Sequence, residues 1–114
     1  MQDNQNFDNV ALELRRGVLV LAVMARLEEE QYGYSLIKLL SEQGLEIDQG
    51  TLYPLLRRLE SQGLLDSTWN VEGSRPRRYY VIGSAGLRVL EALHADWQSL
   101  IQVMEHLLDE KTSL

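Results

Sequence analysis

The sequence predicts a mainly α-helical fold with one small β-hairpin, in the order helix, helix, helix, hairpin, long helix. Two observations predict this class. Apolar residues recur at spacings of three and four in four segments, which is the period of a helix. After Gly63 the pattern changes to aromatic and branched residues around a turn-forming "EGSRP". At 114 residues, the chain has the length of one domain with an ordinary core.

The first helix is expected from about Asn9 to Glu29, after a polar, flexible segment at residues 1–8. Its second half is apolar at nearly every position, so it should be buried on most sides, with the help of a second subunit. The second helix carries "YGYSLIKLLSEQG", with leucine and isoleucine on one face and Gly44 as its stop. The stripe of the first helix consists of Phe7, Ala11, Leu14, Val18, Leu21 and Ala25.

The third helix is expected over "DQGTLYPLLRRLESQG", with a cap at Asp48 or Thr51 and a stop at Gly63. A proline is tolerated only in the first turn, so Pro54 favours a start near Gly50 or Thr51. The apolar face consists of Leu52, Leu55, Leu56 and Leu59. The opposite face collects Gly50, Tyr53, Pro54, Arg57 and Ser61, with Arg58 on its flank.

Two strands, "LLDSTWNV" and "RRYYVI", are predicted on either side of a Gly-Ser-Arg-Pro tip. Pro76 would hold Arg75 and Arg77 extended near this tip. Arg78 alternates to the other side of its strand, where it could face the third helix or phosphates bound there. The aromatic residues of the hairpin would pack it against the third helix or, alternatively, stack on bases; they are Trp69, Tyr79 and Tyr80.

The last helix is expected from about Ser84 to Asp109. Its apolar seam is too wide and too long to be covered by the rest of so short a chain, so it is interpreted as a dimerisation helix. The expected parts are therefore a flexible tail at 1–8, a winged helix-turn-helix at 9–83, a dimerisation helix at 84–110 and a flexible tail at 111–114. The seam consists of Leu90, His94, Trp97, Ile101, Met104 and Leu108, with Leu93, Leu100 and Leu107 beside it.

The charge of the chain is unevenly distributed. Its formal net charge is −6, yet residues 49–88 hold six basic and three acidic residues, a net charge of +3. The remainder holds five basic and fourteen acidic residues, a net charge of −9. A basic segment in an acidic body is typical of a DNA-binding surface. In a winged helix-turn-helix, the third helix enters the major groove and the hairpin lies over the backbone or the minor groove.

The motifs "YGYSLIKLL", "GTLYPLLRRLESQGLL" and "GSRPRRYYVIGSAG", followed by a long helix with a tryptophan, resemble the PadR family of bacterial transcriptional regulators over about residues 11–108. The resemblance implies a homodimer that binds a palindromic operator, represses, and releases DNA when a small phenolic or planar hydrophobic molecule binds. The chain departs from the family pattern at two places. Gly83 and Ser84 stand where a threonine commonly caps the last helix of family members, and Val81 stands at a position that is often basic in them. Neither departure threatens the fold, but both bear on the strength of DNA binding.

Candidate DNA contacts follow from this resemblance and from the charge pattern. Tyr34, Thr51, Tyr53 and Pro54 match the family's backbone-contacting and recognition positions, and Arg75, Arg77 and Arg78 match its wing. Arg57, on the outer face of the third helix, and Arg58, on its flank, are further candidates. The planar guanidinium of arginine can pair with guanine or bind a phosphate. The alternative for this pair is a surface ion pair with Glu60 or Glu42.

Trp97 could stack on a flat ligand in a cleft at the dimer centre, as in some relatives, or simply anchor the interface. His94, one turn before it, is a second candidate for ligand contact, although a packed histidine is the simpler interpretation. No cofactor or metal is expected, because the sequence has no cysteine, no phosphate-binding glycine loop and no metal-ligand spacing.

An enzyme is not expected either, because no nucleophile motif is present. The longest apolar run, "VLVLAVMA", is far shorter than the roughly 20 residues of a membrane span. With no signal peptide at its start, the chain is expected in the cytoplasm. The competing function is a winged-helix module that binds another protein through its acidic body.

Overall fold

The computed structural model describes residues 2–113, with side chains from residue 2 to residue 109. Its elements have the order that the sequence predicts, with one added short strand. The elements are α1 (Gln2–Arg26), β1 (Gln31–Tyr32), α2 (Gly33–Glu42), α3 (Gln49–Ser61), β2 (Leu65–Asn70), β3 (Arg77–Ile82) and α4 (Ser84–Ser113).

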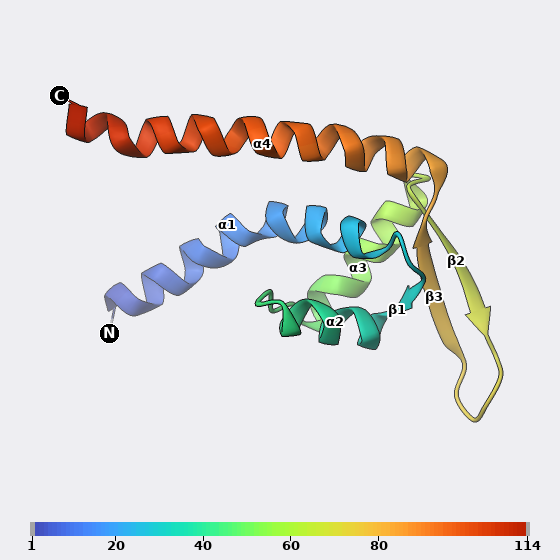
Figure 1. Cartoon of the computed structure of the whole chain (residues 1–114). Helices are drawn as coiled ribbons and strands as arrows, with labels where there is room; N and C mark the ends of the chain where they lie inside the picture. Colours follow the sequence, from blue (N-terminus) through green and yellow to red (C-terminus); the bar gives the residue numbers. More distant parts are fainter. Residues whose placement is uncertain (1, 114) are drawn as a thin grey trace.

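The molecule is elongated, with extents of 62 × 38 × 23 Å. Figure 1 shows α1 and α4 projecting to the same side, while α2, α3 and the hairpin of β2 and β3 gather at the other end. The fold is therefore the predicted mainly α-helical winged helix-turn-helix with a long C-terminal helix. Among the described residues, no helix is long and apolar enough to cross a membrane.

A single apolar core lies where α1, α2 and α3 meet the sheet. The four leucines predicted for the inner face of the third helix are all buried, which confirms that amphipathic pattern. Tyr80 and Ile82 of β3 close the core from the side of the hairpin. The side chains that are almost completely buried are Val23, Met24, Leu27, Leu36, Leu52 and Leu56.

The sheet has three antiparallel strands in the order β1-β3-β2. The predicted hairpin is confirmed, with Leu65 opposite Ile82 and Asn70 opposite Arg77. The short strand β1 was not predicted, because two residues cannot show an alternating pattern. It places Tyr32 opposite Tyr79 and so fixes the start of α2 against the hairpin.

The ends of the two long helices differ from the expected boundaries. The helix α1 begins at Gln2 instead of near Asn9, so residues 2–8 of the expected tail are helical. The segment "QDNQNFD" contains no residue that stops a helix. Because it is almost entirely polar, it also has no apolar repeat from which a helix could be predicted. The helix α4 continues to Ser113, past the expected end at Asp109. Residues 1 and 114 lie outside the described part, and the division at residues 8, 83 and 110 stays a prediction.

The start of α3 is also one or two residues earlier than predicted. Asp48 is the cap, and its Oδ1 accepts a hydrogen bond of 2.8 Å from the backbone N–H of Thr51. Pro54 consequently lies in the second turn, not the first. Its missing N–H leaves the carbonyl of Gly50 without its usual donor, and both residues are exposed to water, which can take that role.

The hairpin passes directly into α4, because only Gly83 separates the two elements. The N–H of Ile82 donates to the carbonyl of Leu27 at 2.7 Å, and the N–H of Gly83 donates to the carbonyl of Leu64 at 3.0 Å. Gly86, in the first turn of α4, lies so close to the Leu64 carbonyl oxygen that an added Cβ would overlap it. The base of α4 is thus fixed to the residue that follows α1 and to the residue that precedes β2.

Candidate nucleic-acid interface

A groove of about 590 Å³ lies between the start of α2, the outer face of α3 and the hairpin. It is lined by aromatic and cationic side chains, and no acidic residue of the described chain takes part. The groove brings together six of the nine residues predicted to contact DNA, which are Tyr34, Tyr53, Arg57, Arg75, Arg77 and Arg78.

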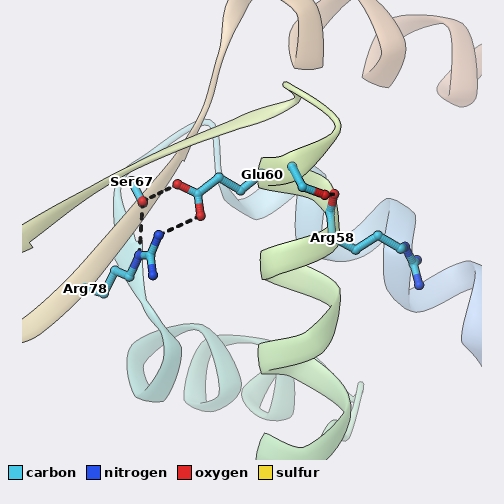
Figure 2. Close-up of polar contacts among 5 residues, drawn as sticks. Arg58, Glu60, Ser67 and Arg78 are labelled. Atoms are coloured by element: carbon cyan, nitrogen blue, oxygen red, sulfur yellow. Dashed lines mark hydrogen bonds and ion pairs between the residues drawn. The ribbon is translucent and has the colours of Figure 1, made fainter.

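The other three predicted residues lie on the opposite flank of α3. Thr51, Pro54 and Arg58 line a smaller depression of about 300 Å³ between α3 and α1, together with Arg16. Figure 2 shows the side chain of Arg58 extending away from Glu60, towards the other side of the helix. The exposed face of α3 therefore has two cationic flanks instead of one.

Arg57 and Arg58 are exposed, and neither forms an ion pair in the part of the chain that the structure describes. The alternative interpretation, in which Glu60 or Glu42 neutralises them, does not hold. Glu60 instead binds a different arginine. Both guanidinium groups of α3 thus keep their full hydrogen-bonding capacity for another molecule.

Arg78 is held within the protein, in contrast to the other arginines. Its Nη2 lies 2.8 Å from Glu60 Oε1, and its Nε donates to Ser67 Oγ at 3.1 Å (Figure 2). The Ser67 hydroxyl in turn donates to the second oxygen of Glu60. We call this group of Glu60, Ser67 and Arg78 the wing clamp, because it joins both strands of the hairpin to α3.

The wing clamp confirms that Arg78 faces the third helix, as strand alternation suggested. The guanidinium also lies 5.5 Å from the ring centre of Tyr80 and 5.7 Å from that of Trp69. Burial raises the pKa of the Tyr80 hydroxyl, and the positive charge of Arg78 opposes that shift. A contact of Arg78 with DNA would have to compete with these contacts inside the protein. The prediction that Arg78 contacts DNA stays a prediction.

Arg77 is stacked but not paired. Its guanidinium carbon lies 4.5 Å from the ring centre of Tyr32, a cation–π contact that orients it while leaving its N–H groups free. The Tyr32 ring meets Tyr79 edge-on at 5.3 Å and lies 6.5 Å from the ring of Tyr34. The short strand β1 thus provides, through Tyr32, the ring on which Arg77 stacks.

The aromatic residues of the hairpin differ in burial. Tyr80 is buried in the core and Tyr79 packs on Tyr32, as expected for packing. Trp69 is 61% exposed and lines the groove, where its ring lies 5.7 Å from the Arg78 guanidinium, and whether it stacks on bases stays a prediction. Gln49 and Gly33 also line the groove and were not predicted. Gln49 could have been found, because it precedes Tyr53 and Arg57 at spacings of four on one face of α3.

Trp97 and His94 do not share a cavity. His94 lines a depression of about 570 Å³ between α1 and α4, which is also lined by Glu28, Glu91 and three leucines. Trp97, which is 37% exposed, lies one turn further along α4 and does not line it. Among the described residues, no group of histidine, aspartate and glutamate is placed to hold a metal ion.

Comparison with known proteins identifies the family. Residues 20–92, which include the whole groove, match the transcriptional regulator PadR-like family. The chain belongs to this family. As a PadR-like regulator it acts in transcription and is not an enzyme, and the family's members bind DNA.

Solved structures of PadR proteins resemble the chain over nearly its full length. A PadR family regulator from Eggerthella lenta is 48% identical, with a TM-score of 0.91 over 96% of this chain and 97% of that one. A PadR-like transcription factor from Bacteroides fragilis is 36% identical, with a TM-score of 0.73 over 87% of this chain and 98% of that one.

Among curated proteins, transcriptional regulator Rv3488 of Mycobacterium tuberculosis is 43% identical over 63 residues. That match covers 55% of this chain and 59% of Rv3488, so the chain spans less than two thirds of its length.

Proposed function

We propose that this PadR-like regulator is a homodimeric, sequence-specific DNA-binding repressor, with α3 in the major groove and the hairpin as its wing. The observation that carries the proposal is the groove between α3 and the hairpin. Three of its arginines, Arg57, Arg75 and Arg77, have no carboxylate partner in the described chain, and no acidic residue lines it. An unneutralised cationic surface of this kind attracts the phosphate backbone.

Within the groove, we expect some residues to bind the DNA backbone and others to contact the bases. Arg75 and Arg77 lie on the hairpin and would position the protein by binding phosphates. Gln49, Tyr53 and Arg57 form one row along α3 and would reach base edges in the major groove. The DNA backbone on the two sides of α3 would be contacted by different residues. Tyr34, at the exposed start of α2, would contact it on one side. On the other side it would be contacted by Thr51, Pro54 and Arg58, which lie on the far flank of α3.

Exposed apolar residues on the two long helices support the dimer. The first half of α1 exposes Phe7, Val10 and Leu14, and these would be unfavourable in water as a large patch. A second copy related by a two-fold axis would cover both helices and present two α3 helices about 34 Å apart, which fits a palindromic operator. The exposed apolar residues of α4 include Leu100, Ile101, Val103, Met104, Leu107 and Leu108.

A small aromatic effector is the remaining part of the proposal. Trp97 is an exposed member of the seam of α4, and His94, one turn before it, lines the depression between α1 and α4. A flat hydrophobic ligand that stacks on Trp97 would change the packing of α4 and so release the operator. A repressor acting on chromosomal DNA would be found in the cytoplasm.

The test is fluorescence anisotropy with duplex DNA that the protein selects from a random pool and with the region upstream of its own gene. We expect the logarithm of the affinity to fall with the logarithm of salt concentration, by about 0.9 for each phosphate contact. Selection of no duplex, or an affinity indifferent to salt, would favour the protein-interaction module instead.

A further inference from the structure

Gly33, the first residue of α2, lies close to the hydroxyl end of the Tyr53 side chain on α3. A Cβ added at position 33 would overlap Cε1 and Oη of Tyr53 and would lie 2.6 Å from Cζ. No carbon atom fits there while the ring keeps its place. The start of α2 and the outer face of α3 are therefore in contact through a position where only hydrogen is accommodated.

The backbone of Gly33 does not itself require glycine. The glycines with a positive φ angle among the described residues are Gly44, Gly63 and Gly73, and Gly33 is not one of them. An alanine could adopt the same backbone and would even favour the helix. The three atoms nearest to an added Cβ all belong to the Tyr53 side chain.

The ring of Tyr53 links the core to the groove. It packs against the core cluster on one side and lines the groove on the other, one turn after Gln49 and one turn before Arg57. Its hydroxyl forms no hydrogen bond within the part of the chain that is described. A tyrosine hydroxyl can both donate and accept, so it is available to a base edge or a phosphate.

We propose that Gly33 is a positioning residue of the DNA interface. By leaving room for the ring, it sets the place of the Tyr53 hydroxyl in the groove, and this hydroxyl contacts DNA. The inference deepens the proposed function and rests on it. It assigns a role in recognition to a glycine on a helix that does not enter the major groove.

The expected effect of Gly33→Ala is a loss of binding without a loss of stability. The added methyl group meets the far end of a flexible side chain and not backbone, so the ring moves and the fold remains. We expect an affinity about tenfold lower, the upper range for one lost hydrogen bond. The slope of affinity against salt should stay unchanged, because no cation is removed.

The test is a double-mutant cycle with Tyr53→Leu, which removes the three overlapping atoms. Binding is measured by anisotropy on a duplex selected by the unmodified protein, and stability by urea unfolding. In the Tyr53→Leu background, Gly33→Ala should have no further effect on binding. Tyr53→Phe is the matched control, because it keeps the ring and its packing but should lose about the same affinity as Gly33→Ala.

Equal binding by Gly33→Ala and the unmodified protein would overturn the inference, as would an equal loss in both backgrounds. If Gly33→Ala alone fails to fold, the double variant must fold, since the overlap is gone; a double variant that is also unfolded overturns the proposal. Failure of the proposed function is distinguishable, because the unmodified protein would then select no duplex.

Discussion

Replacing Arg78 by methionine should distinguish its role in stability, through the wing clamp, from the role of the arginines proposed to bind DNA. The guanidinium holds Glu60 at 2.8 Å and Ser67 at 3.1 Å, with Arg78 and Glu60 side chains 36% and 27% exposed. A hydrogen bond to a charged group contributes about 1.5–3 kcal/mol when buried. Solvent reaches about a third of each side chain here, so we expect about 1 kcal/mol of coupling between the two charges.

The coupling is measured by urea unfolding of Arg78→Met, Glu60→Gln and the double variant at one protein concentration. Arg77→Met is the matched control, because Arg77 is the adjacent cation and has no carboxylate partner in the described chain. Arg78→Met should weaken DNA binding with little change in its salt slope, whereas Arg77→Met should lower that slope by about 0.9.

Two results would refute this reasoning. Additive stability effects of Arg78→Met and Glu60→Gln would mean that the ion pair contributes nothing to folding. A salt slope lowered as much by Arg78→Met as by Arg77→Met would mean that Arg78 leaves Glu60 to bind a phosphate.

Three further predictions concern the interface, the dimer and the recognition helix. Arg75→Ala and Arg77→Ala should weaken binding to all duplexes alike, whereas Arg57→Ala should also change the sequence selected from a random pool; an unchanged selection would remove Arg57 from base reading. Ile101→Glu should give a monomer in light scattering, because it places a charge in the seam of α4, and a persistent dimer would locate the seam elsewhere. Asp48→Ala should lower the free energy of unfolding by about 1 kcal/mol through loss of the cap of α3, and Asp48→Asn, which can still accept a hydrogen bond, should not.

The parts of the fold that repeat along the chain could be predicted from the sequence. The leucines of α3 recur with a helical period because one face is buried. The hairpin could be predicted from aromatic and branched residues on either side of turn-forming residues, although adjacent apolar pairs such as Val81 and Ile82 blur strict alternation. The strand β1 and the polar start of α1 carry no such repeat, so they were missed. Pro54 lies one turn later than predicted, because the carbonyl of Gly50 that it leaves without a donor is on an exposed part of the helix.

The candidate site was predictable residue by residue but not as a set of contacts. The sequence indicates that Arg57, Arg75 and Arg77 belong to a cationic surface, and the groove brings them together. It does not indicate that Arg78 has a partner, because Glu60 lies 18 positions earlier on another element. The overlap between Gly33 and Tyr53 likewise depends on how closely two helices approach, which composition and spacing do not encode.

The junction at Gly83 has a mechanical consequence. The strand β3 and the helix α4 form one continuous length of chain, and the backbone at their junction is hydrogen-bonded to Leu27 and Leu64. A tilt of α4, imposed by a second subunit or by a ligand near Trp97, must bend the chain at this single residue or turn the hairpin with it. Because Gly86 leaves no space against the Leu64 carbonyl, bending there is opposed, and the hairpin tip is the part of the molecule that such a tilt would move farthest.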